Sequence, residues 1–166
     1  MKIREGDGRD VAAVLDMFDG AVAWLVSQGR NGQWGSEPFS GDAKRVAQVT
    51  GWAEGDGMRI AEIDGLPAGC VVVGAANHYV KPATEPELYV QALVTDRHHA
   101  GRGVGAALLA WAEQEAVARG VGLLRVDCYA GDDGRLIAYY ESRGFTRAEP
   151  FTVGSWPGML LHKRLG

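Results

Sequence analysis

The sequence has little cysteine, little proline and no long apolar run, and each shortage excludes a class of protein. Its two cysteines, Cys70 and Cys128, lie in apolar stretches, which excludes a disulfide framework and favours a reducing compartment. Six prolines without a Gly-X-Y period exclude a collagen-like or Pro-rich disordered chain. No run approaches the ~18 apolar residues of a membrane span, and the charged first ten residues lack a signal-peptide core. We therefore expect a cytoplasmic protein with no membrane partner.

Positive charge is also in short supply, whereas glycine is abundant. Seventeen Lys and Arg against 21 Asp and Glu give a net charge of −4. Because a nucleic-acid-binding domain normally carries a basic stripe, we expect no nucleic-acid partner. Glycine accounts for 24 of 166 residues, about 14%, twice the usual ~7%. The length fits one domain over 1–166, on the prior of roughly 100–200 residues per domain.

The spacing of apolar residues predicts a mixed sheet with helices. Strands are predicted at 1–4, 58–63, 66–75, 88–95, 123–129, 145–153 and 159–165, and helices at 10–25, 42–54, 103–119 and 135–143. Asp64-Gly65 between two strands is a strong hairpin signal. The glycine-rich stretch 27–41 is long for a loop, and loops of that length are usually functional or disordered.

The most informative stretch is a glycine-rich turn between a strand and a helix. Gly101, Gly103 and Gly105 remove side chains from this turn, so that backbone N–H groups can approach a ligand closely. The start of the helix adds unpaired donors and a partial positive charge. These features predict an anion site suited to phosphate. Basic side chains surround it, namely Arg97 and Arg102 with His98 and His99.

Two nucleotide-binding motifs are alternative interpretations of this turn. A P-loop needs Gly-Lys-Ser/Thr, which Gly105-Ala106-Ala107 does not supply. The run from Gly101 to Ala106 satisfies the dinucleotide fingerprint G-x-G-x-x-G/A, and Asp127 lies near the position of a ribose ligand. Roughly a hundred residues precede the motif and sixty follow it. That leaves one βαβ unit where a dinucleotide fold needs two halves.

Two segments carry a resemblance to a known family. LYVQALVTDRHHAGRGVGAALLAWA resembles the acetyl-CoA motif of the GNAT superfamily of N-acetyltransferases, and LLRVDCYAGDDGRLIAYYESRGF resembles that family's next strand and helix. Two departures occur: Ala100 replaces the usual Gln or Arg, and the Asn often found at the second helix start is absent. The resemblance implies a single-domain α/β (α+β) fold, with a mixed, mostly antiparallel sheet of six to seven strands and about four helices. It also implies acetyl-CoA as co-substrate and no metal.

The resemblance assigns roles to residues of both segments. The free amides of Leu93 and Val94 would serve the acetyl and pantetheine groups, and the amides of the glycine turn would bind the CoA pyrophosphate. The implied cofactor-binding residues are Leu93, Val94, Gly101, Arg102, Gly103, Val104, Gly105 and Ala106. Tyr140, in the Tyr-x-x-x-Gly-Phe register, would be the general acid that protonates the departing thiolate.

The base and the acceptor contacts are less determined. Glu87, just before a strand, is the expected base, and Asp127 and Glu37 are further candidates. Trp34 in the long loop is expected to line the substrate pocket together with Glu37 and Asp127. Other aromatic residues are available, among them Tyr79, Tyr89 and Trp156, whereas Trp24 falls near the helical stripe and is expected in the core.

Two hypotheses of different class follow. The first is a catalytic N-acetyltransferase that moves an acetyl group from acetyl-CoA to a primary amine by direct attack on the thioester. Its acceptor would be a small molecule or a peptide amine, and the length of the acyl group stays open. The second is a non-catalytic CoA-binding sensor or interaction module of the same fold. Because relatives often dimerise, a homodimer is one assembly to test.

Overall fold

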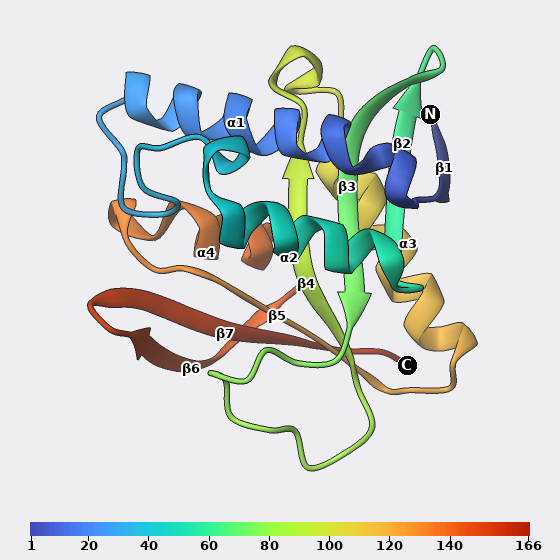
Figure 1. Cartoon of the computed structure of the whole chain (residues 1–166). Coiled ribbons are helices and arrows are strands. Elements are labelled where there is room, and N and C mark those ends of the chain that lie inside the picture. Colours follow the sequence, from blue (N-terminus) through green and yellow to red (C-terminus); the bar gives the residue numbers. More distant parts are fainter. The chain divides into compact units, whose positions relative to one another are not determined.

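The computed structural model describes residues 1–166 and contains seven strands and four α-helices (Figure 1). The strands are β1 (Lys2–Glu5), β2 (Met58–Ile63), β3 (Leu66–Gly74), β4 (Leu88–Thr95), β5 (Leu123–Tyr129), β6 (Thr146–Val153) and β7 (Trp156–Arg164). The helices are α1 (Val11–Ser27), α2 (Ala43–Glu54), α3 (Val104–Ala118) and α4 (Arg135–Ser142), with short 3-10 turns η1 (Gly8–Asp10), η2 (Phe39–Gly41), η3 (Arg97–His99) and η4 (Asp132–Gly134). Every predicted helix and strand is present.

Most predicted boundaries differ from the observed ones by no more than two residues, and the largest difference is at the last strand. The last strand was expected from residue 159, but β7 begins at Trp156, which pairs directly with Val153 of β6. Only Gly154 and Ser155 connect the two strands, and Gly154 has a φ of 59°. Two-residue hairpin turns favour glycine at such a position because it accepts a positive φ without strain.

The strands form one mixed sheet in the order β1-β2-β3-β4-β5-β7-β6. β4 and β5 pair in parallel, whereas β1 with β2, β2 with β3, β5 with β7 and β6 with β7 are antiparallel. The Asp64-Gly65 hairpin is confirmed, with φ values of 53° and 77° at its two central residues. A mostly antiparallel sheet is not a dinucleotide-binding fold, which needs two parallel βαβ halves, so that alternative is wrong.

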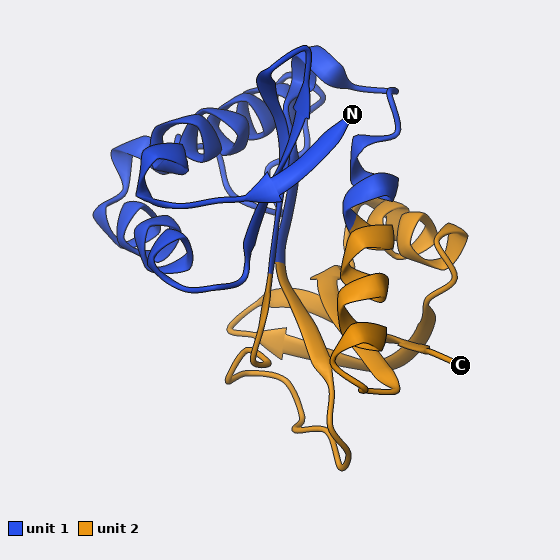
Figure 2. Ribbon diagram, turned by 90° about the vertical axis from the view of Figure 1, so that its right-hand side faces the viewer, with its two compact units in different colours: residues 1–72, 92–108 blue, residues 73–91, 109–166 orange.

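The chain forms two compact units, coloured separately in Figure 2. Unit 1 comprises Met1–Val72 and Ala92–Leu108. Its core joins α1 and α2 to the strands, and Phe18 lies at its centre, stacked on Phe39 with ring centroids 4.4 Å apart. Arg4 and the buried Asp10 form a salt bridge of 2.8 Å near the first strand. The Cys70 thiol lies in this core, and burial raises its pKa to about 12.

Unit 2 comprises Val73–Gln91 and Leu109–Gly166. Its β5, β7 and β6 lie side by side, and Val80, Tyr89 and Leu160 form a small buried cluster with the segment that precedes β4. Burial also raises the pKa of the Cys128 thiol to about 12. Both cysteines are therefore buried free thiols, as the sequence predicts.

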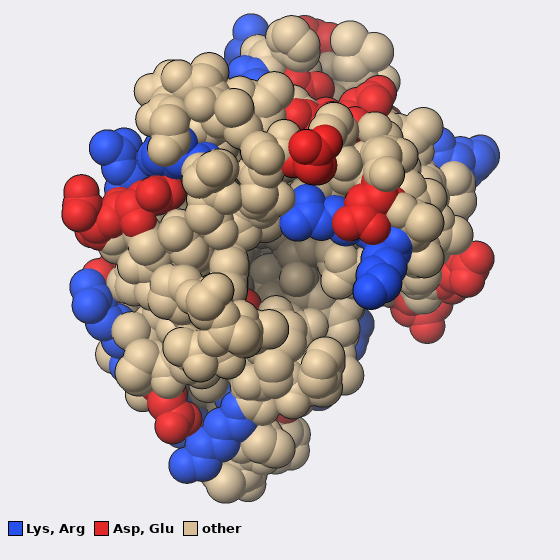
Figure 3. Space-filling model, turned by 60° about the vertical axis from the view of Figure 1, so that its left-hand side comes forward, with Lys and Arg blue, Asp and Glu red and all other residues tan.

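Surface charge, helix length and the grouping of possible metal ligands bear on which partners the protein could bind. On the face drawn in Figure 3, acidic and basic side chains are interspersed among uncharged ones, without a patch of one sign. None of the helices combines the length and the apolar content needed to cross a bilayer. No group of three or more His, Cys, Asp or Glu side chains is arranged to hold a metal ion.

Candidate active site

The glycine turn of unit 1 leads from β4 through η3 into α3. Gly101 and Gly103 have φ values of 78° and 75°, which side chains other than glycine adopt only with strain. The first bond of α3 runs from the Ala107 amide to the Gly103 carbonyl (3.0 Å), so the amides just before Ala107 have no helical acceptor. The Arg102 amide differs because it donates to the His99 carbonyl (3.3 Å). The backbone amides without an acceptor in this turn are therefore those that follow Arg102.

Close packing against β3 fixes the start of α3. A Cβ atom added at Gly69 would lie 2.5 Å from Cγ1 of Val104 and 3.0 Å from Cδ1 of Leu108. The Asp96 amide also donates to the Ala68 carbonyl (2.8 Å), which ties the turn to the same strand. The helix N-terminus therefore has a defined place on the sheet of unit 1, as an anion site on backbone donors requires.

The basic residues of the turn are arranged differently from the expectation. Trp24 is not in the core: it is 37% exposed, and the guanidinium of Arg97 lies 3.8 Å from its ring centroid, with that of Arg30 at 4.8 Å on the same ring. The helical stripe of α1 is formed instead by residues such as Val22 and Leu25, and Trp24 lies beside it. Arg97 is thus held on an aromatic face, whereas Arg102 is exposed.

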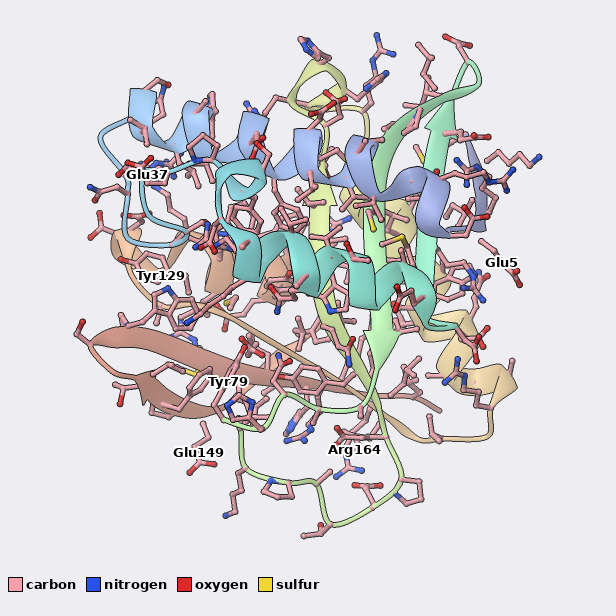
Figure 4. The ribbon with its side chains drawn as sticks, in the orientation of Figure 1. Glu5, Glu37, Tyr79, Tyr129, Glu149 and Arg164 are labelled. Atoms are coloured by element: carbon pink, nitrogen blue, oxygen red, sulfur yellow. The ribbon has the colours of Figure 1, made fainter.

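The other predicted contacts in unit 1 lie on β4 and on the long loop. Val94 is buried in the core, and Leu93 is half-buried. Trp34 lies against the core, with its ring edge-on to Phe18 at 5.2 Å, so part of its surface is already covered by protein. Glu37 is exposed on the loop between α1 and α2 (Figure 4). A substrate role for Trp34 and Glu37 stays a prediction.

Tyr140 lies in unit 2, on α4. It is 6% exposed, and its ring meets the rings of Phe145 and Tyr139 edge-on at 5.7 and 5.4 Å. Its hydroxyl has no hydrogen-bond partner in the chain and is not sealed from solvent. Burial raises the pKa of Tyr140, with the neighbouring Cys128 thiol as a second cause. The phenol is therefore held in its neutral form, with its proton available to a ligand.

Asp127, on β5 of unit 2, is a largely buried carboxylate surrounded by neutral donors. The Tyr89 hydroxyl and the Asn77 amide (3.1 Å) both donate to its Oδ2 atom, and the Tyr79 hydroxyl lies 3.4 Å from its Oδ1 atom. No Lys, Arg or His nitrogen comes within 4.0 Å of it. Burial raises the pKa of Asp127, and the three hydrogen bonds oppose that rise. The carboxyl group thus has three neutral hydrogen-bond donors and no cationic partner.

Glu87 has the opposite environment. Its two carboxylate oxygens accept from Nε and Nη2 of the buried Arg125, at 2.7 and 3.0 Å. Arg125 also donates to the Lys81 carbonyl (2.8 Å). Both oxygens of the Glu87 carboxylate are thus already engaged by a guanidinium, whereas Asp127 has no cationic partner. The base role of Glu87 stays a prediction, and Asp127 is the stronger candidate of the two.

The sequence offered Tyr79 and Tyr89 only as available aromatics, and it gave no role to Asn77. These three side chains come from β4 and the loop before it, 38 to 50 residues from Asp127. The alternation of side chains along β4 and β5 assigns Tyr89 and Asp127 each to one face of its own strand. It does not tell whether these two faces lie on the same side of the sheet. The parallel register, with Tyr89 opposite Arg125, is visible only in the structure.

Comparison with known proteins identifies the family. Residues 26–145 match the acetyltransferase (GNAT) family. The chain belongs to the GNAT acetyltransferase family. It is therefore an acyltransferase, which decides between the two hypotheses in favour of an enzyme. The resemblance drawn from the two sequence segments is confirmed. No curated protein sequence matches this GNAT acetyltransferase.

Solved structures share its fold. An acetyltransferase of the GNAT family from Listeria monocytogenes superposes with a TM-score of 0.76 at 20% identity, over 99% of this chain and 94% of that one. The ribosomal-protein-alanine N-acetyltransferase of Brucella melitensis gives 0.65 at 21% identity, over 99% and 100%. The yncA protein of Salmonella typhimurium, solved with its cofactor acetyl-CoA, gives 0.66 at 20% identity, over 100% and 94%. These likenesses confirm the predicted GNAT fold.

Proposed function

We propose that this GNAT acetyltransferase moves an acetyl group from acetyl-CoA to a primary amine that binds as a cation. The observation that carries the proposal is the buried carboxylate of Asp127, which has three neutral donors and no cationic partner. A buried charge is costly unless it is paired, so such a site favours a ligand that brings the opposite charge. A primary ammonium supplies that charge and three donors.

The glycine turn would hold the pyrophosphate of CoA. The amides of Gly103, Val104, Gly105 and Ala106 precede the first helical bond of α3, and the helix N-terminus adds a partial positive charge. In the same proposal, Gly101 permits the turn, Arg102 adds positive charge at its rim, and the amides of Leu93 and Val94 serve the acetyl and pantetheine groups. No metal is needed for this chemistry, since backbone donors can stabilise the developing oxyanion.

Transfer requires that a proton leave the amine and another reach the thiolate. Asp127 would bind the ammonium and take one of its protons, directly or through water, so that the neutral nitrogen attacks the thioester carbon. A C–N bond then forms, the C–S bond breaks with its electron pair going to sulfur, and the nitrogen releases its second proton to solvent. Tyr140 would protonate that thiolate, because its hydroxyl is unpaired and remains neutral. Glu87 is the second candidate for the base.

The acceptor would be a small molecule or a peptide amine, and the test is direct. Incubation with acetyl-CoA and a panel of primary amines should release free thiol and give an acetylated amine, detected by mass spectrometry. Absence of thiol release with every amine of the panel would contradict the proposal. Asp127→Asn should raise KM for the amine by about tenfold or more, because a charged hydrogen bond is lost, and should lower kcat, because the proposed base is lost. The binding of acetyl-CoA should be unchanged. Asp133→Asn, at an exposed carboxylate, is the matched control.

A further inference from the structure

Three neighbouring strands of unit 2 place aromatic residues in one row. Tyr129 of β5 lies opposite Gly158 of β7, and Gly158 lies opposite Phe151 of β6. Residues directly opposite each other point to the same face of a sheet, and so do residues two apart on one strand. Trp156, two residues before Gly158, therefore shares this face. Tyr129, Phe151 and Trp156 are called the aromatic floor below.

Glycines hold the rings of the floor in place. A Cβ atom at Gly158 would lie 2.3 Å from Cζ of Phe151, so this ring lies directly over the glycine backbone. A Cβ atom at Gly131 would lie 2.2 Å from Cζ and the hydroxyl oxygen of Tyr129. The Trp156 ring lies between the two, 5.6 Å from Tyr129 and 6.3 Å from Phe151. The rings thus form a continuous surface that larger residues at the glycine positions would break.

Asp127 adjoins this floor. It precedes Tyr129 by two residues on β5, so both point to the same face at a spacing of about 7 Å along the strand. Tyr79 forms a second link, because its hydroxyl lies 3.4 Å from Asp127 and its ring stacks on Phe151 at 5.6 Å. Tyr79 and Tyr129 are labelled in Figure 4. Tyr79 is 37% exposed, and the three floor residues are half-buried, so the surface is open to a ligand.

We propose that the acceptor of this enzyme is an arylalkylamine, a primary amine with a flat apolar ring two or three bonds from the nitrogen. The inference rests on the proposed function and adds the acceptor's class to it. The ammonium would pair with Asp127, and the ring would cover the aromatic floor. Aromatic pairs stabilise each other beyond the area that they bury, and a cation gains further from adjacent ring faces. A polyamine or a polyhydroxylated amine would leave the floor without an apolar partner.

The test compares one primary amine that carries an aromatic ring with two that do not. We expect kcat/KM for 2-phenylethylamine to exceed that for n-butylamine and for putrescine by about tenfold or more, as expected for one buried aromatic contact. Equal values, or a preference for putrescine, would overturn the arylalkylamine inference while the proposed function stands. Failure of all three amines, and of a wider panel, to release thiol would instead contradict the proposed function.

A variant locates the effect on the floor. Phe151→Leu should raise KM for 2-phenylethylamine by about tenfold and change kcat/KM for n-butylamine by less than about twofold. Thr152→Ala, in the same strand but on the opposite face of the sheet and exposed, is the matched control and should change neither value. An equal loss for both amines in Phe151→Leu would overturn the assignment of the floor. If Phe151→Leu does not fold, Tyr129→Leu tests the same floor from β5, and the comparison of amines on the unaltered enzyme still decides the acceptor class.

Discussion

The hydroxyl of Tyr89 donates a hydrogen bond to Oδ2 of Asp127, and the two residues belong to β4 and β5, which pair in parallel. Tyr89 is fully buried, and burial together with the nearby carboxylate raises its pKa, so the phenol keeps its proton and acts as a donor. This bond opposes the rise that burial causes in the pKa of Asp127. Tyr89 therefore positions the carboxylate and helps to keep it ionised.

Replacing Tyr89 by Phe should move the pH dependence of the enzyme. The pKa of Asp127 is already raised by burial, and loss of the Tyr89 bond raises it further. The ionised carboxylate is the form that binds the amine. As the pH is lowered, the variant should therefore lose its activity at a higher pH than the unaltered enzyme does. The pH profile of kcat/KM for the amine measures this shift. Tyr79→Phe removes the longer bond of 3.4 Å and should give a smaller shift in the same direction. An unchanged profile for both variants would contradict the role of Asp127.

Replacing Tyr140 by Phe should lower kcat by roughly 100-fold, the usual size of a general-acid contribution. The buried ring and its contacts with Phe145 and Tyr139 would remain, so the free energy of unfolding should change little. Stopped-flow or steady-state thiol release measures the first quantity and thermal unfolding the second. The control variant Tyr139→Phe, at the neighbouring position on α4, should retain the kcat of the unaltered enzyme. Equal rates for the two variants would exclude Tyr140 as the acid.

Replacing Glu87 by Gln separates a structural role from a catalytic one. The change leaves the guanidinium of Arg125 buried without its carboxylate, and breaking such a pair typically lowers the free energy of unfolding by about 3 kcal/mol. We expect the remaining folded enzyme to retain its kcat. Chemical denaturation and the rate per folded molecule measure the two effects. A large fall in kcat with unchanged stability would instead identify Glu87 as the base.

Replacing Gly69 by Ala should displace the start of α3. The new Cβ atom would collide with Val104 and Leu108, and overpacking of this kind lowers stability by about 1–3 kcal/mol. Because the same helix start is proposed to hold the CoA pyrophosphate, the Kd for CoA should rise, as measured by calorimetry. Gly51→Ala, inside α2 with open space around it, should raise stability by about 0.5–1 kcal/mol and leave the Kd unchanged.

Low pH should lower the stability of unit 1 because it protonates Asp10. The Arg4 guanidinium holds the pKa of Asp10 below its usual value, so its contribution is present above the unfolded value near 3.8 and is lost as the pH falls through the lower folded value. Asp10→Asn should lower the free energy of unfolding by about 2 kcal/mol at neutral pH, since Arg4 is only partly buried. It should also flatten the dependence of stability on pH below 4. An unaltered acid profile would contradict this assignment.

The sequence was sufficient for features that depend on local pattern. Apolar periodicity located every helix and strand, and Asp64-Gly65 located its hairpin. Gly101 and Gly103 indicated a turn before a helix, and the structure shows that both have a positive φ. The sequence-based prediction was wrong where the local pattern is ambiguous. Trp24 was expected in the core, but it lies beside the buried face of α1 and is 37% exposed, with the guanidinium groups of Arg30 and Arg97 over its ring.

By itself the sequence determined the order of elements, the glycine turn and the GNAT acetyltransferase family, because each is written in contiguous residues. Only the tertiary structure decided the environments of the two leading carboxylates. Glu87 and Asp127 were both candidates by residue type, yet one is paired with Arg125 and the other has neutral donors alone. The reason is physical: the charges and donors that surround a buried carboxylate come from distant parts of the chain, and strand pairing and the adjoining loop bring them together.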